Sequence, residues 1–317
     1  MHKNKIISLI VFLILFQISI PILAKDISDK PISEEQLTET IFSEFDPHLS
    51  EKYQLLKEAN LRLRREIIKL NNQLYGTAEK IPVLTYHHIL PQEYIVKYKW
   101  YNNDSVISLE AFKEQMDYLY KNGYFTATLD ELKDFLEGKI SLPKKTVVIT
   151  FDDGYLSNAI YAYPIMKEYD FRGTIFMIGS RVNKEEVAFD PSSTQSISIY
   201  EAYKYSNVFD YESHTYDLHK KDKNNKEMLV CSNREVILED LLKCKQLLNA
   251  EYFAYPFGVY NKKTIEYLKE AGYEMAFTTK KGYVTKDSSW YELPRFTISP
   301  KNTTFEKFKQ IVIGNSL

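Results

Sequence analysis

Two adjacent carboxylates, Asp152 and Asp153, follow a run of residues that is typical of a buried strand. The run TVVIT at 146–150 is nearly all β-branched, which suits a strand covered on both faces in a parallel sheet. In parallel α/β folds, the carboxyl ends of strands are where chemical groups are assembled. Two ionised carboxylates side by side repel each other unless a cation or a shared proton relieves them. The pair therefore indicates a metal site.

Two histidines, His214 and His219, stand close together in the segment YESHTYDLH. On a helix, residues five apart point about 140° away from each other, but at a strand end they can bind one ion together. Two imidazoles and one carboxylate leave coordination positions open for water and substrate, as in catalytic zinc sites. In this arrangement Asp153 binds the metal, and Asp152 is free to act as the base that takes a proton from water.

The elements that must position these residues alternate between strand and helix from residue 81 onward, which predicts a mainly parallel sheet or a closed barrel. Strands are expected at 81–89, 125–129, 146–151, 173–179, 209–214, 252–258 and 274–280. Helices are expected at 109–124, 129–138, 157–169, 233–245, 262–272 and 305–314. The aspartate pair and the histidine pair then follow two strands of the same sheet.

The first 24 residues have the layout of an export signal, because Lys3 and Lys5 precede an uncharged apolar run at 6–24. Two outcomes are open: cleavage after Ala24, or retention as an N-terminal membrane anchor, since the run is about long enough to span a bilayer. Either outcome places the rest of the chain outside the cytoplasm, secreted or at the cell surface. The net charge of −2 gives no general attraction for nucleic acid, so nucleic-acid binding is not expected.

Residues 25–80 are expected to form a helical stalk ahead of a catalytic domain at 81–317. Between residues 53 and 74 the apolar side chains follow a heptad, and Asn60 occupies an a position. Two interpretations are open for this 53–74 helix. It is an amphipathic helix that packs on the catalytic domain or acts as a spacer, or it self-associates through the heptad face.

The motifs TFDDG and SHTYDLH resemble the first two motifs of the NodB-homology polysaccharide deacetylases, carbohydrate esterase family 4. Similar segments are PVLTYHHI, GTIFMIG, FAYPFG and LPRF, so the resemblance covers roughly residues 81–299. It implies a distorted (β/α) barrel with fewer than eight strands, which removes N-acetyl or sometimes O-acetyl groups from glycans. By this resemblance Asp152 is the base, and Asp153, His214 and His219 bind the metal. Zinc is expected first, and cobalt, nickel and iron also suit these ligands.

Three departures from the family pattern bear on function. The histidine spacing is one residue longer than usual, which resembles the subgroup that deacetylates poly-β-1,6-N-acetylglucosamine, a biofilm polysaccharide. Ala254 stands where the third motif usually carries an arginine. No histidine follows His219, whereas many members use a late histidine as general acid.

Two further residues are candidates for the catalytic machinery. Arg295 is expected to orient Asp152 by a charge-assisted hydrogen bond, with a surface or structural ion pair as the alternative. His87 ends the first strand and is expected at the rim beside Asp152, with core hydrogen bonding as the alternative, while His88 points to the other face. The substrate-binding candidates are Tyr216, Tyr255, Pro256 and Phe257. The three aromatic side chains are expected to form sugar-stacking walls or part of the acetyl pocket, and in the family the backbone N–H after the proline helps to hold the oxyanion.

The expected function is metal-dependent N-deacetylation of N-acetylglucosamine units in an extracellular polysaccharide. Peptidoglycan N-deacetylation and glycan O-acetyl esterase activity are alternatives, because the motifs define the reaction centre and not the glycan. An inactive carbohydrate-binding protein is a third possibility, supported by the missing late histidine. The intact aspartate and histidine pairs argue against it.

Overall fold

The computed structural model describes residues 47–314, without the side chains of residues 47–54, 56 and 57. The expected signal or anchor at 1–24 and the first part of the expected stalk lie outside the described residues. Within 47–314, no helix is both long and apolar enough to cross a membrane.

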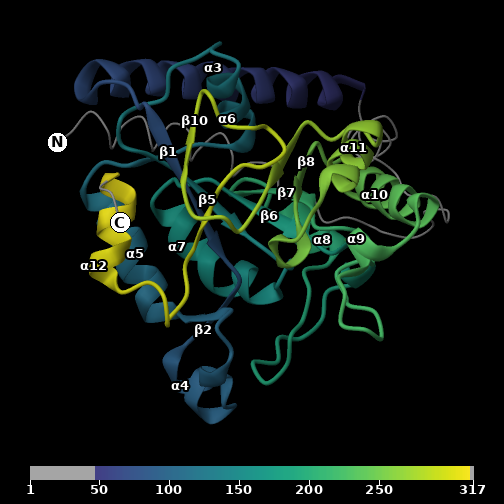
Figure 1. Cartoon of the computed structure of the whole chain (residues 1–317). Helices are drawn as coiled ribbons and strands as arrows, with labels where there is room; N and C mark the ends of the chain where they lie inside the picture. The colour runs from purple at the N-terminus through teal and green to yellow at the C-terminus, as the bar shows by residue number, and fades with distance from the viewer. Residues whose placement is uncertain (1–46, 315–317) are drawn as a thin grey trace. The chain divides into compact units, whose positions relative to one another are not determined.

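A nine-stranded mixed sheet, curled into a half-barrel, forms the centre of the fold (Figure 1). Its order is β10-β1-β5-β6-β7-β8-β9, with β4 beside β5 and β11 beside β1. Only β10 runs antiparallel to its neighbour β1; the other pairs are parallel. The strands are β1 (Lys80–Tyr86), β4 (Phe125–Thr126), β5 (Thr146–Phe151), β6 (Gly173–Met177), β7 (Phe209–Ser213), β8 (Tyr252–Ala254), β9 (Met275–Phe277), β10 (Tyr283–Thr285) and β11 (Phe296–Thr297). A separate parallel pair consists of β2 (His88–Leu90) and β3 (Val106–Ser108).

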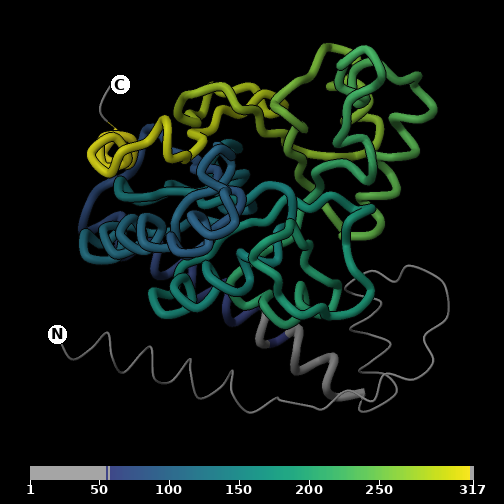
Figure 2. The backbone as a smooth tube through the Cα atoms, turned by 90° about the horizontal axis from the view of Figure 1, so that it is seen from below, coloured from purple at the N-terminus to yellow at the C-terminus, as the bar shows by residue number. Residues whose placement is uncertain are grey.

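The helices largely follow the expected segments. They are α5 (Leu109–Lys121), α6 (Leu129–Leu136), α7 (Tyr163–Glu168), α10 (Arg234–Leu248), α11 (Lys262–Glu270) and α12 (Phe305–Ile313). The short helices α4 (Gln92–Lys97), α8 (Ile199–Lys204) and α9 (Met228–Cys231) were not expected. The C-terminal α12 packs beside α5, as both views of the chain show (Figure 1, Figure 2).

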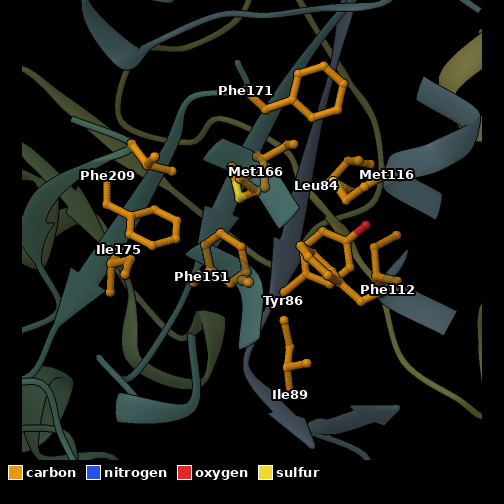
Figure 3. Packing of buried hydrophobic residues seen from close by; sticks show 14 of the residues in the cluster. Leu84, Tyr86, Ile89, Phe112, Met116, Phe151, Met166, Phe171, Ile175 and Phe209 are labelled. Carbon is orange, nitrogen blue, oxygen red and sulfur yellow. The ribbon is translucent and has the colours of Figure 1, made fainter. Parts of the chain in front are cut away.

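Side-chain alternation along β5 separates two cores. Phe151 and the other outward residues of β5 pack with Phe112, Met166 and Phe209 in the cluster of Figure 3. Val148 belongs instead to the cluster inside the half-barrel, with Phe176. Because successive residues of a strand face opposite sides, residues 148, 150 and 152 share the interior side. The first catalytic candidate, Asp152, therefore continues the interior face of β5.

The segment at 290–297 runs from the edge strand β9 to β1, near the other end of the sheet. At its start, Ala276 N donates to Trp290 O at 2.8 Å and Leu293 N donates to Ala276 O at 3.0 Å, which extends β9. At its end, β11 pairs with β1. Arg295 lies between these two contacts and is fully buried. The chain thereby carries one arginine into the interior of the half-barrel.

The helix α3 (Pro47–Tyr75) contacts the domain that follows it. The guanidinium group of Arg64 donates to both carboxylate oxygens of Glu131, at 2.7 and 2.8 Å, and to Thr126 O at 2.9 Å. Ile68 is buried in the interior cluster. The packing interpretation is confirmed for this part of the helix. The heptad residues Leu70 and Leu74 are exposed and take no part in this contact, so self-association stays a prediction.

Truncation of Arg64 tests how much this contact contributes. Arg64→Ala is expected to lower the free energy of unfolding by about 1–2 kcal/mol, because Glu131 and Thr126 O lose a charged donor in a partly buried setting. Arg62→Ala is the matched control: Arg62 pairs with Glu58 at a site that is 73% and 62% exposed, where a change within about 0.5 kcal/mol is expected. Urea unfolding measures both. Equal losses of stability in the two variants would contradict the assignment of Arg64 as a stabilising contact between α3 and the domain.

Candidate active site

Asp153, His214 and His219 meet at the carboxyl ends of β5 and β7. Oδ1 of Asp153 lies 3.7 Å from Nε2 of His214 and 3.3 Å from Nε2 of His219. One ligand atom from each residue lies within 4.8 Å of the others, so one ion can reach all three. The convergence predicted from the two motifs is therefore present in the structure.

The backbone at these positions is unusual. Asp153 has a φ of 73° and Thr215, next to His214, has a φ of 70°. Non-glycine residues in this left-handed region cost free energy and persist where the surrounding structure holds them. At both positions the surrounding structure must hold the backbone; for Thr215, Gly179 N and Sγ of Cys244 donate to its carbonyl oxygen.

The hydrogen bond of His214 fixes which ring nitrogen faces the site. Its Nδ1 lies 2.7 Å from Ala254 O. A carbonyl oxygen only accepts, so Nδ1 carries the proton and the lone pair of Nε2 faces Asp153. Burial of the ring lowers the pKa of His214. For His219, burial of its own ring and, next, the neighbouring charge of protonated His214 lower the pKa to about 4. Both imidazoles are therefore neutral near pH 7, as metal ligation requires.

The donor set fits a divalent cation. Oδ1 of Asp153 is buried and accepts no hydrogen bond, which is unfavourable for a carboxylate unless a cation satisfies it. Two imidazole nitrogens and one carboxylate oxygen match a catalytic zinc site with open positions. Among the described residues, this is the one group of three such side chains close enough to hold a metal.

Asp152 is held by Arg295 through two parallel hydrogen bonds. Arg295 donates to Oδ1 at 2.8 Å and to Oδ2 at 2.7 Å, and also donates to Thr278 O and to the hydroxyl of Thr150. Both charged groups are buried. Burial opposes ionisation of Asp152, but the charges of Arg295, His214 and His87 outweigh it and lower the pKa of this carboxyl. Asp152 is therefore an oriented, ionised carboxylate, and the expected charge-assisted hydrogen bond is present.

His87 and His88 diverge, as the strand pattern predicted. His87 is half-buried at the site. Burial opposes ionisation of Asp153, but the charge of His87, followed by those of the histidine ligands, lowers the pKa of that carboxyl. His88 is only 2% exposed, and its Nδ1 lies 2.7 Å from Oγ of Ser157.

The buried imidazole of His88 predicts acid sensitivity. Burial lowers its pKa from 6.5 to about 4, so between these values the unfolded chain binds a proton that the folded chain does not. Acidification from pH 6.5 to 4 should therefore remove about 3 kcal/mol of stability through this group. His88→Asn, which keeps a polar atom near Ser157, should be less stable at pH 7 but lose less on acidification. Ser157→Ala keeps the imidazole and serves as the control. Parallel curves of stability against pH for wild type and His88→Asn would exclude His88 as a source of the acid sensitivity.

The substrate-binding candidates do not all reach the surface of the site. Phe257 is 45% exposed, and its ring centroid lies 4.4 Å from that of His219. Tyr255 is fully buried, donates to Tyr291 O at 2.9 Å and stacks on Tyr260, so it does not form a sugar-stacking wall.

Pro256 and Tyr216 are also poorly placed for stacking on a sugar. Pro256 is buried beneath the turn that exposes its neighbour Phe257. The ring of Tyr216 packs so closely on Gly179 that an added Cβ there would lie 2.7 Å from it. Nζ of Lys243 lies 3.9 Å from the centroid of the same ring. Of the four candidates, Phe257 alone offers an exposed aromatic face beside the ligands.

Sequence reasoning missed Asp240, which holds the loop that carries both histidines. Its two carboxylate oxygens accept from the backbone N–H groups of Tyr216, Asp217 and Leu218, at 2.8, 2.6 and 3.0 Å. From the same helix, Sγ of Cys244 donates to Thr215 O at 3.2 Å. In the sequence, the feature that could have identified Asp240 is its position as an acidic residue on the buried face of the helix expected at 233–245.

Comparisons with known proteins agree with this geometry. Residues 139–276 match the family model described as polysaccharide deacetylase. The poly-beta-1,6-N-acetyl-D-glucosamine N-deacetylase of Staphylococcus aureus (strain NCTC 8325 / PS 47) is 30% identical over 231 residues, which cover 68% of this chain and 78% of the relative. The structure of IcaB from Ammonifex degensii superposes on this chain with a TM-score of 0.61 and 28% sequence identity. The match covers 74% of this chain and 97% of the IcaB chain. The structure of Streptococcus pyogenes deacetylase PplD in complex with acetate has a TM-score of 0.62 and 25% sequence identity. The match covers 74% of this chain and 99% of the PplD chain.

The resemblance predicted from the motifs, the fold class and the hydrolase class are therefore confirmed. The half-barrel matches the deacetylase fold of these structures, and the carboxylate and imidazole groups lie at the carboxyl ends of its strands. The chain belongs to the polysaccharide deacetylase family and is a carbohydrate deacetylase, a hydrolase acting on carbon–nitrogen bonds.

Proposed function

We propose that this protein removes N-acetyl groups from N-acetylglucosamine units of an extracellular polysaccharide resembling poly-β-1,6-N-acetylglucosamine, and releases acetate. The observation that carries the proposal is the Asp152 carboxylate, fixed by Arg295 beside a triad that can bind one divalent ion. The named substrate of the S. aureus relative supports the choice of glycan.

The proposed metal ligands are Asp153, His214 and His219, with zinc as the first candidate. When bound, such an ion acts as a Lewis acid that activates water and polarises the acetamide carbonyl. Asp152 takes the proton from the attacking water, since it is ionised and still has free lone pairs beside its two bonds to Arg295.

Two further groups complete the proposed reaction. The backbone N–H of Phe257 is the candidate donor to the developing oxyanion. His87, whose charge acts on both aspartates, is the candidate donor of a proton to the leaving amine. Acetate leaves, and a free amine remains on the sugar.

The proposed location is extracytoplasmic, either secreted or held at the cell surface through residues 6–24. This part of the proposal rests on the charge and hydropathy pattern of the first 24 residues. Self-association through the heptad face of the 53–74 helix is kept as a proposal, supported by the exposure of Leu70 and Leu74.

Acetate release from defined oligosaccharides tests the function. With zinc or cobalt added, wild type should release acetate from β-1,6-linked N-acetylglucosamine oligomers, and Asp152→Asn should reduce kcat by about 10²–10⁴-fold while still binding metal. Better turnover of β-1,4-linked oligomers would favour a peptidoglycan-type substrate, and release from O-acetylated glycans alone would favour the esterase alternative. No release from any glycan by metal-loaded protein would favour the binding alternative.

A further inference from the structure

Several basic side chains lie on the segments beside the site, and the proposed chemistry does not use them. The cationic rim, as we name it, comprises Arg181, Lys220, Lys221 and Lys243. Two of its members are paired: Lys220 with Asp217 at 2.5 Å, and Lys221 with Glu227 at 3.4 Å. No described acidic residue lies within salt-bridge distance of Arg181 or Lys243, although the charge of Arg181 acts on the carboxyl group of Asp217.

Arg181 is tied to the loop that carries the histidines. It ends a short helical turn, η3 (Gly179–Arg181), that follows the carboxyl end of β6. In this turn Gly179 N donates to Thr215 O at 3.0 Å, and Ser180 N donates to Tyr216 O at 2.6 Å. The charge of Arg181 acts on His219 and Asp217, which lie on that loop. The guanidinium group is therefore an exposed charge beside the site.

Two lysines of the rim lie over aromatic rings near the histidine ligands. Nζ of Lys221 is 5.5 Å from the centroid of Phe257, whose ring lies against His219. Nζ of Lys243 is 3.9 Å from the centroid of Tyr216, two residues after His214. Both lysines are exposed to solvent. A glycan that brings an acetamide to the metal ligands would pass close to these charges.

The product of deacetylation is positively charged, whereas the substrate is neutral. Each turnover converts an acetamide into an amine that is protonated near neutral pH. We propose that the cationic rim disfavours glycan stretches that already contain glucosamine, so that acetyl groups next to a free amine are removed slowly. This inference rests on the proposed function. Repulsion between like charges gives specificity, and it is screened over a Debye length of about 8 Å at physiological salt.

The rim would therefore set the pattern of the product. A glucosamine unit bound next to the reacting sugar would lie nearer to the rim than one several sugars away, whose charge is screened by salt. The enzyme should leave acetylated sugars between deacetylated ones. It should also release the charged product readily.

Two β-1,6-linked hexasaccharides of N-acetylglucosamine test this inference, one fully acetylated and one with a single glucosamine in the middle. Wild type with added zinc should show a kcat/KM per acetyl group about 5–10-fold lower next to the glucosamine, and this ratio should approach one at high salt. Arg181→Glu combined with Lys221→Glu should abolish or invert the discrimination. Mass spectrometry of the products locates each removed acetyl group.

Arg62→Glu is the charge-matched control, because α3 contacts the domain near the start of β5, at Thr126, and not at its carboxyl end. This control should keep the wild-type ratio. A ratio that the double variant leaves unchanged, or that salt does not alter, would overturn the role of the rim while acetate release from the acetylated hexasaccharide still supports the proposed function. No acetate from either hexasaccharide with wild type would overturn the proposed function itself.

Discussion

Asp153→Asn is expected to weaken zinc binding severely and to reduce kcat/KM for acetate release by about 10³-fold or more, a loss of several kcal/mol of transition-state stabilisation. The substitution removes the only anionic member of the triad and leaves two neutral imidazoles. Asparagine is preferable to alanine here, because Asp153 has a φ of 73° and asparagine tolerates this left-handed conformation well. The variant therefore changes charge with little change of backbone.

Stability of the metal-free protein separates loss of the site from misfolding. Without metal, wild type holds a buried carboxylate oxygen that accepts no hydrogen bond, next to the charge of Asp152. Asp153→Asn should therefore unfold at the same urea concentration as metal-free wild type, or at a higher one. Added zinc should stabilise wild type and Asp104→Asn, an exposed control, but not Asp153→Asn. An unchanged zinc affinity of Asp153→Asn would contradict its assignment as a ligand.

The parts of the site that sequence could predict are those that follow a strand directly. The β-branched run before Asp152 identifies a buried strand, and strand alternation then separates the directions of His87 and His88. The His214 and His219 pair is informative because it also follows a strand, where a five-residue separation permits both rings to reach one ion. These predictions need only local structure and the rule that parallel strands end at one edge of the sheet.

The errors arose where the environment of a side chain comes from distant segments. Strand alternation places Ala254 inside the half-barrel, so its neighbour Tyr255 faces the helical layer, where Tyr260 and Tyr291 bury it. The burial of Tyr255 depends on residues that are distant in the sequence, whereas the prediction of sugar stacking used only its aromatic side chain. Similarly, heptad spacing identifies the apolar face of α3, but the contact with the domain is made through Arg64 and Glu131, 67 residues apart.

Arg295→Met is expected to destabilise the metal-free protein by about 3–5 kcal/mol, because it leaves Asp152 ionised and buried without its partner. The pKa of Asp152 should rise, since Arg295 is the largest favourable influence on its ionised form. A depressed carboxyl pKa contributes stability above the unfolded value near 3.9, and that stability is lost as pH falls toward the folded value. The difference between wild type and Arg295→Met should therefore shrink on acidification.

A double-mutant cycle with Asp152→Asn distinguishes a specific pair from general disruption. Asp152→Asn alone leaves the buried guanidinium group without its carboxylate, so it should also be destabilising, while the double variant removes both charges and should lose much less than the sum of the two. Thr278→Val controls for local disruption: it removes the hydroxyl's bonds with Leu293 O and Lys280 N but keeps the backbone carbonyl to which Arg295 donates. Additive losses in the cycle would mean that Arg295 supports the fold without orienting the base. Coupling of about 2 kcal/mol or more, with loss of kcat in Arg295→Lys, would assign it to the orientation of Asp152, because lysine cannot form two parallel bonds to one carboxylate.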